Sequence, residues 1–273
     1  MKKHAVLIAL VVAMVSTTTT HSDAARIGVL APIGMSENDV LRWSENVAQA
    51  EGKSVPFINA NTIVIFDNIT DMLMALRAGR IDRFNVGIYT AQYIATRNKD
   101  LALIDHHHNP ILGLSLAMRE EDKPKMQAVN LAISGMKSDG TLERLIRENI
   151  IVSGEPVAVD FPVIEGGEVM RVAVTGDLPP IDYVDPAGRP AGFNTAFLAE
   201  LSRRTGRNIE LVSVSAGTRQ SAISSGRVDA VMWTNNVYNM KRELLPYPLD
   251  KMMGLVISEP YLFQSRGAVE RAK

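Results

Sequence analysis

Two carboxylates flank a double-proline turn in the stretch TGDLPPIDY. Asp177 precedes the prolines and Asp182 follows them. A carboxylate with a raised pKa can act as a general acid or base, so this turn is a candidate for catalysis. The sequence shows no Ser-His-Asp set and no spacing typical of metal ligands that would support such chemistry. The residues therefore favour a binding protein over an enzyme.

Three consecutive histidines, His106 to His108, follow the apolar stretch LALID. Imidazole binds zinc, nickel or copper, so a metal site is one interpretation. Successive side chains along an extended segment point to opposite faces, however, and three adjacent histidines seldom share one ion. The chain has no cysteine, which excludes disulfides, thiolate metal sites and a lipid-modified N-terminal cysteine. We expect an exposed loop, with neither a metal nor another cofactor.

The composition is that of a globular protein. The chain has 273 residues, of which 46% are hydrophobic and 22% charged, and its formal net charge is −1. This length supports one large domain or two lobes that each bury a core. A net charge near zero, without basic residues interleaved with aromatics, argues against a nucleic-acid partner.

The N-terminus has the three parts of a secretory signal peptide. Two lysines precede an apolar run from Ala5 to Val15, and a polar stretch ending in small residues follows, with Ala24 or Ala25 as the expected last residue removed. A membrane anchor is the alternative, but the apolar run is too short to cross about 30 Å of hydrocarbon. We expect residues 1–24 to be cleaved and the mature chain to be a periplasmic monomer.

Strands alternate with helices from Arg26 onward. The expected strands of the first half are 26–30, 62–66, 81–89, 101–105 and 111–118. The expected helices are 38–50, 69–79, 90–98, 123–140 and 141–149. Ser36 is a plausible N-cap of the first helix. This alternation predicts an α/β fold in which helices cover parallel sheets.

Residues 151–169 contain Gly, Pro and acids without a helical period, and we interpret them as a connector with room for one edge strand. The alternation then restarts, with strands expected at 171–176, 208–214, 227–233 and 254–263. Helices are expected at 195–206 and 218–226, and residues 234–251 read as irregular. LRAGRIDRF at 76–84 resembles ISSGRVDAV at 223–231, which indicates either two lobes of one design or the chance use of common helix-end residues.

One long run of motifs carries a specific resemblance. VAVTGDLPPIDYVDPAGRPAGFNTAFLAELSRRTG is followed by ISSGRVDAV and then by SEPYL. This order resembles the first lobe of the family 3 extracellular solute-binding proteins, which are periplasmic receptors for amino acids and similar polar solutes. The resemblance implies the type II periplasmic-binding fold, with two lobes around a hinged cleft. It implies capture of a small polar ligand for uptake by the membrane permease of an ABC transporter. The alternatives are a ligand sensor that docks on a membrane receptor and a dehydratase-like periplasmic enzyme.

The first half resembles the remainder of the same family. RIGVLAPIGMSEN resembles the opening of the second lobe, and ILGLSLAM with the helices after it resembles the segment that returns to the first lobe. The halves therefore stand in swapped order, as in a circular permutant cut at the crossover after SEPYLF and rejoined through the connector. The expected division is a second-lobe segment at 25–110, a return segment at 111–150, a connector at 151–169 and a first-lobe segment at 170–273. A tandem of two truncated domains is the competing interpretation, and it would leave apolar surface exposed.

The resemblance places the first-lobe site on loops at strand ends. In the double-proline turn, the matching positions are Asp177, Ile181, Asp182 and Tyr183. For Ile181 the alternative is packing inside the lobe, and Asn194, where the family has Asp, could simply cap a helix.

After the strand 227–233, the family presents polar groups to a ligand carboxylate. The matching residues here are Trp233, Thr234 and Asn235, and Trp233 could equally be structural. The position of the arginine that grips the carboxylate falls on Lys241, with Arg242 beside it. Lysine cannot reproduce a bidentate guanidinium fork, so Arg219 and Arg242 are the candidates for this role.

In the second lobe, the resemblance places an anion-holding loop at Gly34, Met35 and Ser36, where a plain helix cap is the alternative. Amino-acid receptors of the family place an aspartate at the end of the strand that corresponds to 81–89, where this chain has Gly87. The polar neighbours that could compensate are Asn85, Tyr89 and Thr90. Without that carboxylate a buried ammonium would be poorly paired, at a cost of several kcal/mol, so we expect a ligand different from the family norm.

Overall fold

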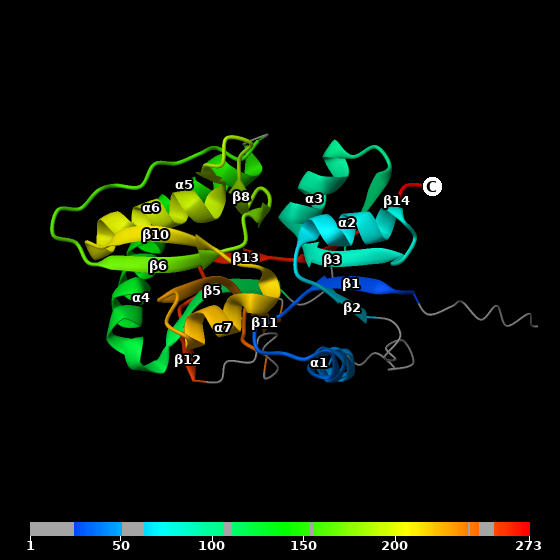
Figure 1. The fold of residues 1–273 in the computed structure, drawn as a ribbon, viewed down its shortest axis with the longest axis horizontal. Helices are drawn as coiled ribbons and strands as arrows, with labels where there is room; N and C mark the ends of the chain where they lie inside the picture. Colours follow the sequence, from blue (N-terminus) through cyan, green and yellow to red (C-terminus); the bar gives the residue numbers. More distant parts are fainter. Residues whose placement is uncertain (1–24, 51–62, 106–110, 153–154, 240, 246–253) are drawn as a thin grey trace, which may run out of the picture.

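Two separate sheets, each covered by helices, form the two lobes visible in Figure 1. The computed structural model describes residues 25–50, 63–105, 111–152, 155–239, 241–245 and 254–273. The expected signal peptide and the histidine run lie outside these residues. The expected α/β class is confirmed.

The first sheet, which we call the β1 sheet, has the order β2-β1-β3-β14-β4. Its strands are β1 (Ile27–Leu30), β2 (Ile63–Phe66), β3 (Arg83–Gly87), β4 (Leu101–Asp105) and β14 (Arg266–Arg271). β2, β1 and β3 are parallel, while β14 is antiparallel to both of its neighbours.

The second sheet, the β6 sheet, has the order β10-β6-β11-β5-β12, and β13 also pairs with β5. Its strands are β5 (Ile111–Arg119), β6 (Val169–Val174), β10 (Asn208–Ser213), β11 (Ala230–Tyr238), β12 (Leu255–Ile257) and β13 (Leu262–Gln264). β10, β6 and β11 are parallel, and β5 is antiparallel to β11 and β12.

The two sheets share one plan. Each has three parallel strands, then an antiparallel strand that arrives from the other lobe, then an edge strand. β5 follows β4 out of the β1 sheet, and β14 follows β13 with only Ser265 between them. The chain therefore passes between the lobes at these two places, and the carboxyl ends of the parallel strands of each sheet lie toward the other lobe (Figure 1).

Helices cover both sheets, and a small third sheet lies beside α6. The helices are α1 (Glu37–Ala50), α2 (Ile69–Arg77), α3 (Ile88–Arg97), α4 (Lys123–Ser138), α5 (Thr141–Ile146), α6 (Phe193–Thr205) and α7 (Arg219–Ser224). Two 3-10 turns at Glu120–Asp122 and Ala216–Thr218 and a π-helical turn at Arg147–Ile151 complete them. The small sheet consists of β7 (Asp177–Leu178), β8 (Asp182–Val184) and β9 (Pro190–Ala191).

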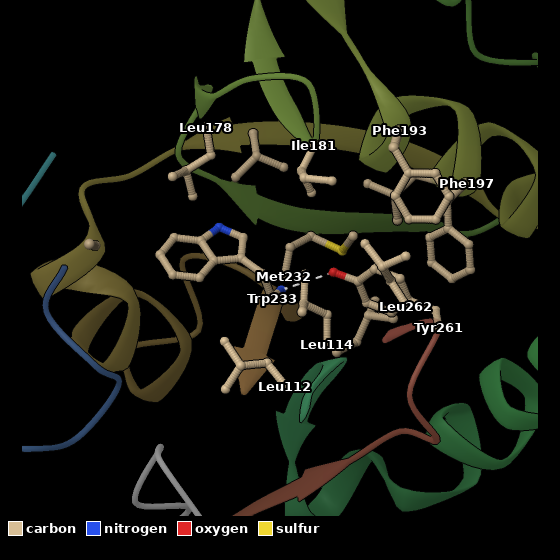
Figure 2. Packing of buried hydrophobic residues seen from close by; sticks show 14 of the residues in the cluster. Leu112, Leu114, Leu178, Ile181, Phe193, Phe197, Met232, Trp233, Tyr261 and Leu262 are labelled. Atoms are coloured by element: carbon tan, nitrogen blue, oxygen red, sulfur yellow. Dashed lines mark hydrogen bonds between the residues drawn. The ribbon is translucent and has the colours of Figure 1, made fainter. Parts of the chain in front are cut away.

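The core of the β6 lobe contains a stack of aromatic rings. Phe193 and Phe197 of α6 pack against Tyr261, with the Phe197 and Tyr261 ring centroids 4.5 Å apart (Figure 2). All three side chains are almost fully buried. Buried aromatic pairs of this kind add stability beyond the area they remove from water, and here they join α6 to the segment that leads into β13.

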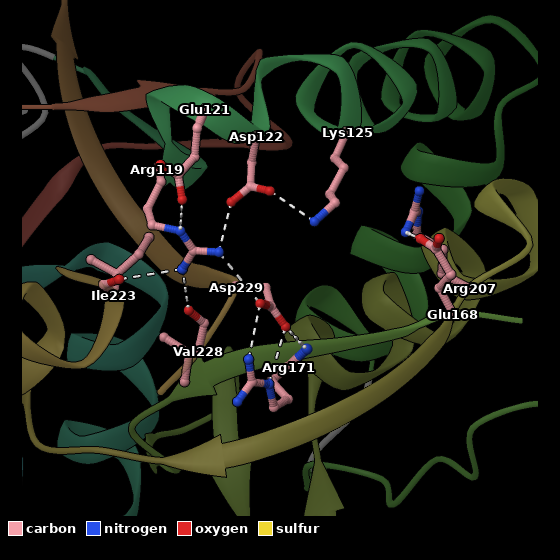
Figure 3. Close-up of polar contacts among 10 residues, drawn as sticks. All are labelled: Arg119, Glu121, Asp122, Lys125, Glu168, Arg171, Arg207, Ile223, Val228 and Asp229. Carbon is pink, nitrogen blue, oxygen red and sulfur yellow. Dashed lines mark hydrogen bonds and ion pairs between the residues drawn. The ribbon is translucent and has the colours of Figure 1, made fainter. Parts of the chain in front are cut away.

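A charge network joins the ends of β5, β6 and β11 that lie away from the other lobe (Figure 3). Asp229 accepts a hydrogen bond from the backbone N–H of Arg171 at 2.9 Å. It also forms an ion pair with the guanidinium of Arg171 at 3.2 Å. Arg119 bridges Asp229, at 3.5 Å, and Asp122, at 2.7 Å. The guanidinium of Arg171 lowers the pKa of Asp229 against the opposing effect of burial. These charges have partners within the chain, so we assign the network a structural role.

Several sequence-based boundaries were wrong, and three of them change how the chain is divided into elements. β11 continues to Tyr238 through residues expected to be irregular, because it pairs with β5 along this length. The strand expected at 254–263 is divided into β12 and β13, and the further strand β14 follows. β3 ends at Gly87, and α3 begins at Ile88 rather than at Thr90.

β14 lies in the range 170–273, which we expected to form one lobe, yet it pairs with β3 and β4 of the β1 sheet. Within the connector, Ala158 makes an isolated bridge to Ala191. The edge strand for which the connector had room is therefore reduced to a single pair.

Candidate functional site

The lobes bond directly to each other at a boundary that we call the interlobe seam. It is defined by the residues that bond across it, Ala31, Asp67, Ile69, Asp177, Ala216, Gly217 and Arg219. The N–H of Ile69, the first residue of α2, donates to Asp177 Oδ2 at 2.7 Å. The N–H of Gly217 donates to Asp67 Oδ1 at 3.1 Å. Open α/β sheets bind ligands at the carboxyl ends of their strands, so the seam is the candidate site.

Arg219 is the most deeply buried charged residue of the seam, with 1% of its surface exposed. Its guanidinium donates to the carbonyl oxygens of Ala216 at 3.1 Å and Trp233 at 3.4 Å, and across the seam to that of Ala31 at 2.9 Å. It also lies over the indole of Trp233, 3.9 Å from the ring centroid. Carbonyl oxygens and an aromatic face together stabilise a buried guanidinium. Arg219 therefore fixes the loop after β1 to the opposite lobe.

Trp233 occupies an irregularity in β11. The register of β11 against β5 shifts between Val231 and Thr234, and Trp233 has a positive φ of 43°. A bulky residue in this conformation is strained and must be held by its surroundings. The N–H of Trp233 donates to the hydroxyl of Tyr261 at 3.2 Å (Figure 2), and its indole N–H has no hydrogen-bond partner among the described residues. Strain of this kind is concentrated at binding sites, which supports Trp233 as a site residue.

The two residues after Trp233 have different environments. Thr234 is 1% exposed and donates its hydroxyl to the carbonyl oxygen of Ser115 at 2.8 Å, so its side chain belongs to the interior of the β6 sheet. Asn235 is half-buried and donates to the carbonyl oxygen of Trp233 at 3.3 Å. Of the two, Asn235 is placed to support the strained tryptophan.

The double-proline turn divides its candidates between the interior and the seam. Ile181 is buried in the main hydrophobic cluster, which is the alternative that the sequence left open. Asp182 is also buried and accepts hydrogen bonds from the N–H groups of Thr175 at 2.9 Å and Gly176 at 3.2 Å. Burial raises the pKa of Asp182 to about 6, against the opposing effect of these bonds. Asp182 therefore holds the turn together, while Asp177 reaches across the seam.

Tyr183 lies near a polar cluster at the edge of the seam. In this cluster, Tyr93 of α3 donates its hydroxyl to Glu155 at 2.8 Å, and Arg97 donates to the same carboxylate at 3.0 Å. Arg97 also lies over the Tyr93 ring at 3.7 Å. Burial and the bond to Glu155 raise the pKa of Tyr93 to about 12, with a smaller contribution from Tyr183. The cluster joins the connector to the β1 lobe beside the expected ligand contact Tyr183.

The loop after β1 holds Gly34, Met35 and Ser36. Ser36 accepts a hydrogen bond from the N–H of Asp39 at 3.3 Å, and its own N–H donates to the Asp39 carboxylate at 3.0 Å. This reciprocal pair is a helix cap, the alternative that the sequence left open. Gly34 is exposed with φ of 68°, and Met35 is half-buried. Ile33, which the sequence did not single out, is 1% exposed and packs in a hydrophobic cluster of the opposite lobe.

The family resemblance of the second half is confirmed by comparison with known families. Residues 170–245 match the profile of the bacterial extracellular solute-binding proteins, family 3. The match covers 76 of the 273 residues, and over this segment the chain is similar to that family. Its members are extracellular by description, and the described residues include no helix with the length and apolarity needed to cross a membrane. The expected type II fold of this solute-binding family agrees with the two sheets and the two crossings.

Other comparisons show more distant likenesses. No curated protein matches the chain. The glutamate-bound ligand-binding core of GluR0 is 13% identical with a TM-score of 0.38, and the match covers 92% of this chain and 86% of that one. A zinc-bound ligand-binding component of an ABC-type import system from Staphylococcus aureus is 13% identical with a TM-score of 0.42, covering 90% and 65%. The aliphatic sulphonate-binding protein SsuA from Escherichia coli is 14% identical with a TM-score of 0.36, covering 90% and 64%. This chain thus spans just under two thirds of the last two, and such values say nothing about its ligand.

The β6 sheet contributes a residue that the sequence did not predict as a solute-binding candidate. Gln264 of β13 is 8% exposed, and a Cβ placed on Gly87 would overlap its carboxamide. Gln264 therefore occupies the space that a side chain at position 87 would fill. Asn85 lies two residues before Gly87 in β3 and is half-buried. In the sequence, Gly87 indicated that a side chain from elsewhere must fill the space beside it. Only the fold shows that this side chain is Gln264.

The remaining candidates lie at the start of α3 and beside β13. Tyr89 is half-buried, and burial raises its pKa, whereas Thr90 is 3% exposed. Arg242 is exposed with φ of 61°, and its guanidinium lies 4.8 Å from the ring centroid of Phe263. Arg219, not Arg242, is therefore the arginine that the fold brings into the seam. Within the described ranges no group of three His, Cys, Asp or Glu side chains could hold a metal.

Proposed function

We propose that the chain is a periplasmic solute-binding protein that captures a small polar ligand between its two lobes and delivers it to the permease of an ABC transporter. The observation that carries this proposal is the seam itself. A family 3 segment supplies the buried Arg219 and the strained Trp233 at the point where it meets the strand ends of the β1 sheet. A sensor that passes the closed form to a membrane receptor would use the same site. Binding without turnover is the proposed activity, since Asp182, the carboxylate with the raised pKa, is engaged by its own turn.

Thermal unfolding of the mature chain tests ligand capture. A ligand that binds only the folded state at about 100 times its Kd stabilises it by about 2.7 kcal/mol, so a screen of small polar metabolites is expected to yield at least one clear increase in Tm. Ligand that copurifies must first be removed by partial unfolding and dialysis. Absence of any stabilising compound from protein shown by mass spectrometry to be ligand-free would contradict the proposal, and conversion of a bound compound would establish an enzyme instead.

We also propose that the halves of this chain are circularly permuted relative to the family. Supporting this, Ile27 of β1 and Glu270 of β14 both pair with Arg83, from opposite sides of β3. The end of β14 and the start of β1 are therefore about 10 Å apart, which is two strand spacings. The residues after α5 lead through the connector to β6. The connector therefore joins the two halves of the sequence within one two-lobed fold.

A rearranged chain tests the proposed permutation. Residues 153–273, which include the connector, would be followed by a flexible link of about six residues, which can span the gap, and then by residues 26–152. The rearranged protein is expected to unfold cooperatively, with a free energy of unfolding within about 1 kcal/mol of the original chain, because the contacts are kept. Failure of this chain to fold, while a chain with the same link inserted in the 151–169 connector does fold, would contradict the permutation.

A further inference from the structure

Two carboxamides lie together at the carboxyl end of β3. Asn85 and Gly87 are two residues apart in one strand, so the Asn85 side chain and a Cβ placed on Gly87 would project from the same face, about 7 Å apart. The space at Gly87 is filled by the carboxamide of Gln264, which comes from β13 of the other sheet. Asn85 and Gln264 therefore form an amide pair where the two lobes meet.

Both amides have an oxygen without a hydrogen-bond partner. Asn85 Oδ1 and Gln264 Oε1 are buried, and neither accepts a hydrogen bond from any described residue. A buried acceptor that lacks a donor costs free energy, and native structures rarely leave two of them together. The amide pair therefore holds two neutral, buried acceptors that lack a donor.

The charged groups of the seam are, by contrast, engaged within the chain. Arg219 donates to three carbonyl oxygens, one of them across the seam. The N–H of Ile69 at the start of α2 is taken by Asp177, and the N–H of Gly217 is taken by Asp67. A carboxylate ligand would have to displace these partners. An ammonium ligand beside β3 would meet Gly87, neutral amides and the same-face arginines Arg83 and Arg266 instead of a carboxylate.

We propose that the solute of this site is uncharged and donates hydrogen bonds from N–H or O–H groups to Asn85 Oδ1 and Gln264 Oε1, as a carboxamide, a urea or a polyol would. This rests on the proposed function, because it assumes that the seam takes up a solute. Neutral donors satisfy both oxygens without placing a charge in a buried site, where an unpaired ion is strongly disfavoured.

A matched set of probes tests the charge of the ligand. Lactamide, lactate, alaninamide and alanine share one carbon skeleton but are uncharged, anionic, cationic and zwitterionic, and the screen adds ureas and sugar alcohols with amines and acids of equal size. The mature, ligand-free chain is expected to be stabilised by uncharged probes and to bind charged ones at least tenfold more weakly. Binding of amines, acids or amino acids in preference overturns the inference but leaves the proposed function standing. Binding of no probe of any class overturns both.

A variant pair tests the amide pair itself. Gln264→Glu places a carboxylate at the end of β3 and is expected to weaken the uncharged ligand at least fivefold and to improve the binding of alaninamide. Gln92→Glu adds the same charge on an exposed position of α3 and is expected to change neither. Equal effects of the two variants overturn the assignment. If Gln264→Glu does not fold, Asn85→Asp takes its place, with the same expectation and the same control.

Discussion

Replacement of Arg219 by alanine is expected to lower the free energy of unfolding by about 3–5 kcal/mol, because buried carbonyl oxygens lose a charged donor and a cavity is left. Three carbonyl oxygens lose their donor, and the indole of Trp233 loses the guanidinium 3.9 Å from its centroid. The side chain also leaves a cavity where only 1% of its surface was exposed. Urea unfolding followed by circular dichroism measures the loss.

Two further variants separate this effect from the loss of one positive charge. Arg227→Ala removes an exposed arginine a few residues away and is expected to change stability by no more than about 0.5 kcal/mol. Arg219→Lys keeps the charge but cannot reach three carbonyls or stack as a plane, so an intermediate loss is expected. If Arg219→Ala were as stable as Arg227→Ala, the seam contacts of Arg219 would contribute nothing to the fold.

Stability should fall as the pH rises through the range in which Asp182 ionises. The pKa of Asp182 is raised from 3.8 to about 6 by burial, so in this interval the unfolded chain releases a proton that the folded chain retains. The contribution is fully present below pH 4 and lost above pH 6. A shift of about 2 units corresponds to about 3 kcal/mol, and this is the expected difference between acidic and neutral pH. Unfolding in urea at pH 4, 5, 6 and 7 measures it against Asp182→Asn.

The variant separates this carboxylate from the others in the chain. Asp182→Asn cannot ionise, so its stability relative to the parent should rise between pH 4 and pH 6. Asp182→Asn also loses stability because the N–H groups of Thr175 and Gly176 no longer donate to a carboxylate. That loss is independent of pH, so it does not change how the stability difference varies with pH. Asp100→Asn is the control of opposite sign, because the hydrogen bond from Arg77 lowers the pKa of Asp100. A stability difference between Asp182→Asn and the parent that is independent of pH would contradict the assignment.

The sequence predicted the α/β class and most elements because apolar periodicity dominates them. The sequence-based prediction failed where pairing between strands, rather than residue composition, decides whether a segment is a strand. The polar residues Thr234 and Asn235 read as irregular, yet they continue β11, since β5 supplies the hydrogen bonds and the carbonyl oxygen of Ser115 accepts from Thr234. β14 carries arginine at both ends and becomes a strand because β3 and β4 lie on either side of it.

The site was predictable only in part for a related reason. Arg219 and Trp233 were named from motif positions, and the fold brings them into direct contact. Ile181 and Asp182 occupy the same motif but point inward, and no periodicity in such a short turn indicates this. Gln264 was not predicted because its role depends on β13 crossing beside Gly87, more than 170 residues away in the chain. Contacts of this length leave no local pattern.

The direct bonds across the seam set a kinetic condition on the proposed capture of a solute. Backbone N–H groups of Ile69 and Gly217 must release their carboxylates, that of Ala216 must release the carbonyl oxygen of Asp67, and Arg219 must release Ala31, before a molecule can pass between the strand ends. The rate of entry is then limited by the fraction of time for which these bonds are broken. A solute with perfect complementarity would associate far below the diffusion limit, and its measured affinity would be reduced by the same fraction.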